Sequence, residues 1–231
     1  MKLSNLTSIE AWLRSDFSIL ASKLGANETT IQKWSNALIS RYTEPQRYYH
    51  TIEHIHSMLK CLERYRYLVI DETAMELAIF FHDWIYDPRG QGNEIGSVKC
   101  FEEFAAETSL AESVIVRVSE YIECTITHTL PIEDGEADSD LRLFLDIDLE
   151  VLSRNEADYA LYAAQIRREY SHFSEGDYCT GRIKVLKAFL ERDRLYFSDG
   201  FYEMHEETAR GNLKSEIELL EGKLKAMEGC G

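Results

Sequence analysis

The chain has 231 residues, of which 45% are hydrophobic, with only 3 Pro and 12 Gly and a formal net charge of −16. The hydrophobic content excludes global disorder, and the scarcity of turn residues favours long helices over a many-stranded β fold. A surface this acidic repels a phosphate polymer, which argues against a long nucleic acid as partner but leaves a small phosphorylated substrate open.

Apolar residues at helical spacing predict an all-α fold. The predicted helices span, in chain order, 7–23, 28–42, a third stretch that starts near Arg47 or His50, 72–86, 93–107, 110–128, 139–152, 155–172, 178–193 and 199–227. The helix over 72–86 is apolar on all sides, which predicts a buried position. Loops are predicted over 87–92 and over the acidic stretch 133–140. No linker divides the chain, so we predict a single domain over 1–231.

The sequence shows neither the pattern of a membrane span nor that of a signal peptide. No apolar run approaches the ~18 residues that a membrane span needs, and the charged, amphipathic N-terminus lacks the apolar core of a signal peptide. The five cysteines are scattered without a CxxC pair, which is typical of a reducing compartment. We therefore expect a cytoplasmic protein that does not associate with membranes.

The segment 141–151 fits two structures. Apolar residues alternate with others at period two, which indicates a strand, but the same residues also fit a buried helix. The choice matters for Asp146 and Asp148, which share one face of a strand but point about 200° apart on a helix. On a helix, only one of them could reach a given metal ion.

Three groups of ionisable residues stand where a purely structural role explains them poorly. His50 and His54 have the i,i+4 spacing at which one helix face can offer two imidazoles to a metal, although two surface histidines would fit the same pattern. His82 and Asp83 follow the apolar run 77–81. A carboxylate in such a place needs a metal, a helix cap or an arginine as compensation.

The third group is Asp146 and Asp148, which again interrupt an apolar run and need a positive partner. Taken together, the three groups predict a site for a divalent metal. Imidazole and carboxylate ligands without thiolates favour Mn, Mg, Fe, Co, Ni or Zn in an open, catalytic coordination shell.

This ordered set of a histidine, a His-Asp pair and a later aspartate resembles the HD superfamily of metal-dependent phosphohydrolases. The segments RYYHTIEHI, FFHDWIYD, NEIGS, FLDIDLEVL and IRREY are similar to those of small bacterial HD-type phosphohydrolases without an agreed substrate. The resemblance covers roughly residues 8–220. It implies an HD-domain helical bundle with a core at about 45–195 and additional N- and C-terminal helices packed on it.

The resemblance also implies roles for single residues. His54, His82 and Asp83 would be metal ligands, with Asp83 also part of the catalytic machinery, and Asp148 would be the fourth ligand. Asp146 would orient a ligand or water, or would itself replace Asp148. His50 matches the general acid of the distantly related cyclic-nucleotide phosphodiesterases and would protonate the leaving oxygen while a metal-activated water attacks phosphorus. Their purine-gripping glutamine segment has no counterpart here, so cyclic-nucleotide hydrolysis is not predicted.

The remaining candidates have simpler structural explanations beside the functional ones. His128 would supply a second metal or the substrate with a further imidazole, or would be a helix-terminal histidine favoured by the dipole. Three arginines would grip a phosphate or form salt bridges in an acidic chain. These arginines are Arg47, Arg167 and Arg182.

The function predicted from this set is hydrolysis of a small phosphorylated substrate, such as a nucleotide, with a divalent metal. Two alternatives stay open. An HD-type di-iron oxygenase would need additional histidine ligands, for which His128 is the candidate. A non-catalytic, metal-binding regulatory domain would keep the ligands alone. The Glu/Lys pattern after residue 203 is typical of a solvated helix face and would also support a homodimer.

Overall fold

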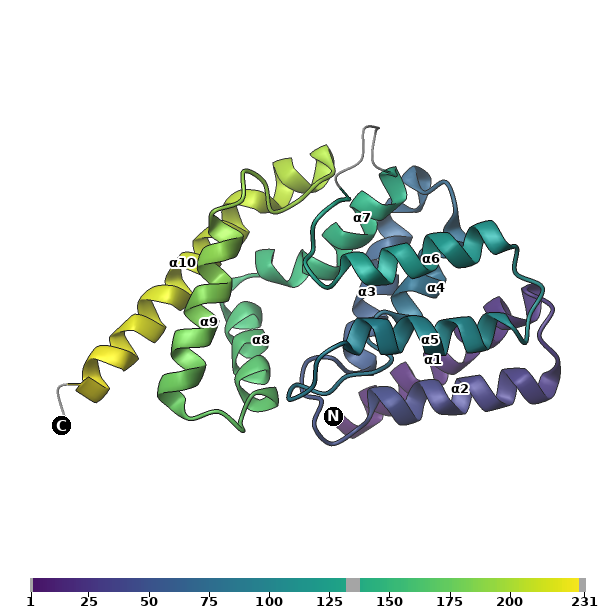
Figure 1. The fold of residues 1–231 in the computed structure, drawn as a ribbon, viewed down its shortest axis with the longest axis horizontal. Coiled ribbons are helices and arrows are strands. Elements are labelled where there is room, and N and C mark those ends of the chain that lie inside the picture. Colours follow the sequence, from purple (N-terminus) through teal and green to yellow (C-terminus); the bar gives the residue numbers. More distant parts are fainter. Residues whose placement is uncertain (1, 132–137, 229–231) are drawn as a thin grey trace. The chain divides into compact units, whose positions relative to one another are not determined.

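The computed structural model describes residues 2–131 and 138–228, and these form helices without any strand (Figure 1). The elements are α1 (Lys2–Lys23), α2 (Glu28–Tyr42), α3 (Ile52–Tyr65), η1 (Arg66–Leu68), α4 (Glu72–Phe81), α5 (Asn93–Ala105), α6 (Glu112–Cys124), α7 (Ser139–Asp148), η2 (Leu149–Ser153), α8 (Glu156–Glu169), α9 (Glu175–Leu190) and α10 (Asp199–Glu228), where η marks a 3-10 helix. The predicted all-α class is confirmed.

The chain divides into two compact units, residues 1–144 and residues 145–231. The division falls inside α7, whose first six residues belong to the first unit. The prediction of one domain over the whole chain stays a prediction, as does its description as an HD domain. The acidic loop expected over 133–140 lies largely outside the described residues, and α7 already begins at Ser139.

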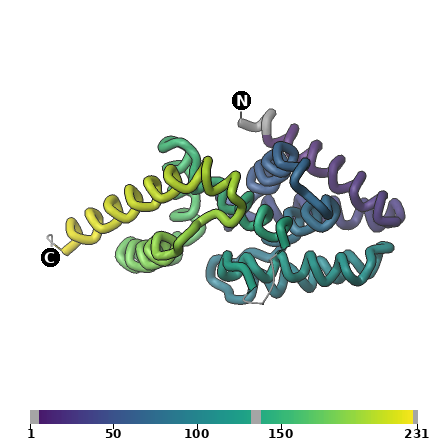
Figure 2. Tube along the Cα trace, turned by 90° about the horizontal axis from the view of Figure 1, so that it is seen from above, coloured from purple at the N-terminus to yellow at the C-terminus, as the bar shows by residue number. Residues whose placement is uncertain are grey.

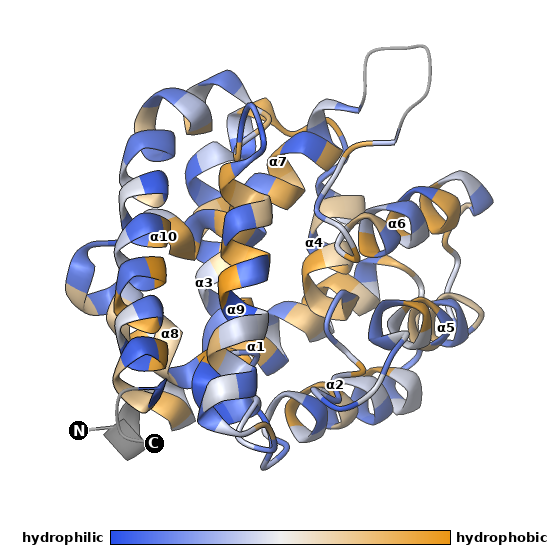
Figure 3. Cartoon of the chain, turned by 60° about the vertical axis from the view of Figure 1, so that its left-hand side comes forward, coloured by the Kyte–Doolittle hydropathy of each residue, from blue (hydrophilic) through white to orange (hydrophobic). Residues whose placement is uncertain are grey.

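Helix α4 is the centre of the first unit, where it packs against α3, α5 and α6. Its apolar residues from Ala74 to Phe81 are fully buried, as predicted, and Figure 3 shows the helix in the colours of hydrophobic residues. The Phe80 ring meets that of Phe17 edge to face at 5.2 Å, and the Phe81 ring stacks on that of Trp84 at 4.6 Å. Such aromatic contacts fix the end of α4 tightly in the core.

Helix α3 begins at Ile52, two residues after the predicted start near His50 and five after the alternative start near Arg47. Thr51 is the N-cap: its backbone is extended, with φ −115° and ψ −178°, and its side chain accepts a hydrogen bond from the N–H of Glu53. The N–H of Thr51 donates to the carbonyl of Tyr49, which turns the chain before the helix starts. His50 and His54 therefore do not share a helix face.

The segment around Asp146 and Asp148 is helical, so the strand interpretation is wrong and the buried-helix interpretation is confirmed. Helix α7 is held in the first unit near its start, where the Asp140 carboxylate accepts the N–H groups of Ile70 and Asp71. Farther along, the Phe144 ring lies 5.9 Å from that of Tyr121. Burial of the apolar face decides for the helix because both Phe144 and the alternating leucines face inward.

The second unit consists of the end of α7 with η2, α8, α9 and α10. Helix α10 has 30 residues and runs without a break in Figure 2. Helices α9 and α10 pack along each other and enclose a buried ion pair between Arg182 and Glu216 at 2.9 Å. Tyr159 of α8 donates its hydroxyl to the same carboxylate. No helix among the described residues is both long and apolar enough to cross a membrane.

Candidate metal centre

The C-terminal end of α4 orients the first candidate ligand, His82. The last carbonyls of a helix have no partner within it. Here the carbonyl of Phe80 accepts the hydroxyl of Tyr42 at 2.9 Å, and the carbonyl of Ile79 accepts from Nδ1 of His82 at 3.0 Å. Because a carbonyl only accepts, Nδ1 carries a proton. The same contact therefore satisfies the helix end and turns Nε2 of His82 away from it.

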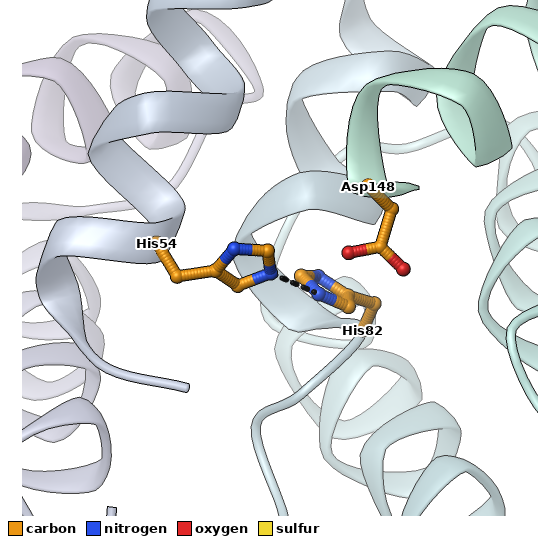
Figure 4. A group of neighbouring side chains, drawn as sticks. All are labelled: His54, His82 and Asp148. Carbon is orange, nitrogen blue, oxygen red and sulfur yellow. Dashed lines mark hydrogen bonds between the residues drawn. The ribbon is translucent and has the colours of Figure 1, made fainter. Parts of the chain in front are cut away.

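His54 reaches the same place from the first turn of α3 and is 5% exposed. Its Nε2 lies 3.2 Å from Nε2 of His82 (Figure 4). The rings are 5.3 Å apart and inclined at 68°, and the Tyr49 ring lies 4.9 Å from that of His54. Two imidazoles from different helices thus direct their outer nitrogens at one point.

Asp83 adds a carboxylate oxygen to this compact group of candidate ligand atoms. Its Oδ2 lies 3.1 Å from Nε2 of His82 and 3.9 Å from Nε2 of His54. Atoms that bind one cation at about 2.1 Å with angles of 90–110° lie about 3.0–3.4 Å apart. The two shorter separations match this range, and the third exceeds it by about half an ångström.

The position of the proton on His82 means that this group of side chains needs a cation. With its proton on Nδ1, a neutral His82 presents a lone pair from Nε2 to an oxygen of Asp83 that is itself an acceptor. Two acceptors at this distance require a cation between them, either a proton on Nε2 or a metal ion. This is also the tautomer in which histidine binds metals, with the other nitrogen held by a carbonyl. The donor set fits a divalent cation.

Asp83 is held in its ionised form. Burial raises the pKa of this carboxyl, but the charges of His82, His50 and His54, together with the hydrogen bond to His82, outweigh it and hold the pKa well below its ordinary value. The side chain keeps 19% of its surface exposed. A carboxylate that stays ionised and partly accessible suits a metal ligand.

Asp148 is the last residue of α7, one turn beyond Phe144, whose ring lies 6.0 Å from that of His82. Residues four apart share a helix face, so α7 carries Asp148 towards the two histidines. One oxygen of Asp148 and one ring nitrogen each from His54 and His82 all lie within 4.8 Å of one another (Figure 4). Three protein ligands of this kind are the number found in catalytic zinc sites.

Asp146 points elsewhere, as expected for a helix. Its side chain is fully buried, and its two oxygens accept the N–H groups of Phe197 and Ser198 at 2.6 and 2.8 Å and the hydroxyl of Ser198. These groups precede α10, which begins at Asp199. Burial raises the pKa of Asp146 to about 6 despite the hydrogen bonds, because no cation compensates it fully. Asp146 is thus occupied in holding the start of α10.

His50 lies beside the group, although not on its helix. Its ring is 5.9 Å from that of His54 and stacks on the Tyr86 ring at 4.3 Å with an angle of 30°. The charge of His50 is among those that lower the pKa of Asp83. The predicted general acid therefore stands within electrostatic reach of the candidate ligands.

The other predicted residues lie in varied surroundings. His128 follows α6, donates its N–H to the carbonyl of Cys124, and has a φ of 48°, a left-handed conformation uncommon in a non-glycine residue. Arg167 and Arg182 belong to the second unit, where they pair with Glu175 and Glu216. Arg47 is buried beside the candidate ligands.

Several supporting groups could not be predicted from the sequence. The carbonyl of Ile79, which orients His82, leaves no trace in a sequence, since every residue has one. Ser97 of α5 is fully buried, and its hydroxyl oxygen accepts the N–H of Ile85, two residues after Asp83. In the sequence Tyr86 looks like an ordinary aromatic residue of the core, yet the ring of His50 stacks on it. The position of Ser97 beside Gly96 and Val98 gives no signal of this contact in the sequence.

No protein-family model, curated protein or solved structure matches this chain.

Proposed function

We propose that this protein is a metal-dependent phosphohydrolase that acts on a small phosphorylated substrate such as a nucleotide. His54, His82 and Asp83 would hold a divalent cation, with Asp148 as a fourth ligand. The observation that carries the proposal is the convergence of two Nε2 atoms and one carboxylate oxygen, separated by 3.2, 3.1 and 3.9 Å, with the His82 proton fixed on the far nitrogen.

A divalent cation in this place would polarise a phosphoryl oxygen and make a water molecule more acidic. Groups of the chain itself, including a backbone carbonyl, set the rest of the chemistry. Ile79 holds His82 in one tautomer, and Asp83 stays ionised. Four protein ligands of this kind leave coordination positions for substrate on Mn, Mg, Fe, Co or Ni, which suits a catalytic rather than a structural site.

His50 is the residue proposed to move a proton. Histidine titrates near neutral pH, so it can give a proton to the leaving oxygen of a phosphate ester. The stack on Tyr86 holds the ring beside the ligands without placing it among them. The net charge of −16 favours a small substrate, because a long nucleic acid would be repelled beyond the site.

The test is metal analysis of the purified protein, combined with phosphate release from a panel of nucleotides in the presence of each candidate metal. We expect about one bound divalent metal and metal-dependent release that His82→Ala abolishes. His56→Gln is the matched control, because His56 lies on the same helix but packs against Trp12 at 5.0 Å. Undiminished release by His82→Ala would contradict the proposal.

Other outcomes of the same test identify the alternatives. Two irons per chain, with absorption that changes on reduction by dithionite, would point to an oxygenase. Bound metal without turnover of any substrate class would point to a regulatory, metal-binding domain.

The proton transfer is tested separately with His50→Gln. General acid catalysis contributes on the order of 100-fold or more, so phosphate release should fall by about that factor while the metal content stays unchanged. A poor leaving group should suffer more than a good one such as p-nitrophenolate. Equal losses for both would remove His50 from the role.

A further inference from the structure

We infer that Arg47 is a positioning residue of this centre, which fastens the segment before α3 to the segment after α4. The inference rests on the proposed function, since it concerns the same ligands. The sequence suggests a phosphate-gripping or salt-bridging arginine at this position. The structure confirms the salt bridge, which Arg47 forms with Glu44, and turns the terminal nitrogens of its guanidinium onto backbone carbonyls beside the candidate ligands.

The contacts of Arg47 join the two segments that carry the ligands. Its side chain is 0% exposed. One terminal nitrogen donates to the carbonyl of His50 at 3.1 Å and to that of Asp83 at 2.9 Å. The other donates to the carbonyl of Trp84 at 3.1 Å. A single guanidinium thus spans from the residue four places before His54 to the turn that contains Asp83.

The remaining surfaces of Arg47 are also engaged. Its Nε donates to Glu44 at 3.2 Å, and its guanidinium lies over the rings of Tyr42 and Tyr86 at 4.9 and 5.2 Å. Tyr86 in turn carries the ring of His50. Arg47 therefore fixes His50 in two ways, through its carbonyl and through the aromatic ring on which it stacks.

The chemistry of the turn explains why an arginine is needed. The helical hydrogen-bond pattern ends at Phe81, so the carbonyls of Asp83 and Trp84 have no helical partners, and a buried carbonyl without a donor is costly. The planar fork of a guanidinium reaches several acceptors at fixed angles, whereas an ammonium is a compact point charge. Lysine would keep the charge but not the geometry. Without the fork, the distance between Asp83 and His54 is no longer set.

The experiment is a titration of the full-length, metal-free protein with Co²⁺, followed by its visible d–d absorption, which reports both affinity and coordination. We expect Arg47→Lys and Arg47→Met to bind Co²⁺ at least 10-fold more weakly than the native protein, with altered bands, at a temperature where circular dichroism shows them folded. A purely electrostatic role would let lysine restore the native affinity and spectrum. That outcome would overturn the inference.

Arg41→Met is the matched control. Arg41 also pairs with Glu44, at 3.2 Å, but its side chain is 45% exposed, whereas that of Arg47 is 0% exposed. The Arg41→Met variant should bind Co²⁺ as the native protein does. A loss as large as that of the Arg47 variants would overturn the inference, because it would trace the effect to the charge of this region.

If neither Arg47 variant folds, the Co²⁺ affinity of Glu44→Gln tests the inference. This substitution weakens the ion pair between Glu44 and Nε of Arg47, and Glu44 is partly exposed. A Co²⁺ affinity about 3-fold lower supports the inference, and an unchanged one overturns it. The two proposals fail in different ways. A native protein that binds no Co²⁺ refutes the metal centre and the inference with it, whereas native binding that Arg47→Lys leaves intact refutes the positioning role alone.

Discussion

Two groups of buried side chains in this protein are partnered differently, the carboxylates of the second unit and the ionisable residues around the end of α4 in the first unit. In the second unit each of the carboxylates Asp146, Glu206 and Glu216 meets donors from the chain itself. Glu206 accepts the N–H groups of Leu195 and Tyr196, and Glu216 pairs with Arg182. In the first unit, His54, His82 and Asp83 turn acceptors towards one another. The carboxylates of the second unit have their donors within the chain, whereas the acceptors that converge at the end of α4 need a cation between them, either a second proton on His82 or a metal ion.

The largest expected effect on the free energy of unfolding comes from breaking a buried ion pair of the second unit. Glu216→Ala leaves Arg182 buried without its carboxylate and should lower the free energy of unfolding by about 3–5 kcal/mol. Urea denaturation checks this. Glu175→Ala is the control, because its ion pairs with Arg167 and Lys223 are exposed and should contribute less than about 1 kcal/mol. Equal losses in both variants would contradict the distinction between buried and exposed pairs.

The next effect concerns the converging acceptors. A metal at 100 times its dissociation constant stabilises the native protein by about 2.7 kcal/mol, so EDTA should lower its melting temperature. Asp83→Asn should remove this dependence on metal, because it takes away the charge of a proposed ligand. Asp87→Asn, four residues farther on and exposed, should keep it. A melting temperature of Asp83→Asn that still falls with EDTA would exclude Asp83 as a ligand.

The smallest effect tests whether Asp146 is free of any metal. Its pKa of about 6 lies above the ordinary value, so the folded state binds this proton more tightly than the unfolded state does. The stability that the group contributes is complete at low pH and is lost as the pH rises through 6. Relative to Asp146→Asn, the native protein should lose about 1 kcal/mol of unfolding free energy between pH 5 and 7. An unfolding free energy that instead rises between pH 5 and 7, relative to Asp146→Asn, would indicate a cation bound to Asp146.

The sequence pattern predicted some features of the candidate site correctly and others wrongly. His82 and Asp83 could be predicted because they directly follow an apolar run. Burial of a carboxylate in such a place costs free energy unless a metal, a helix cap or an arginine compensates its charge. The spacing of His50 and His54 predicted a shared helix, and this was wrong. Thr51 competes for the helix start through its side chain, and such local caps shift a boundary by a few residues without altering the apolar pattern.

The metal centre proposed at the end of α4 therefore has two sources. Composition and periodicity determined the all-α class, the buried α4 and the three places where polar groups enter apolar helices, because each depends on nearby residues alone. Tertiary structure decided the rest. It separated Asp148 from Asp146 by placing them on opposite sides of α7 and fixed the His82 tautomer through Ile79. It also turned Arg47 inward onto carbonyls of distant residues. These outcomes depend on which backbone groups lack partners once the helices are packed, and no sequence pattern records that.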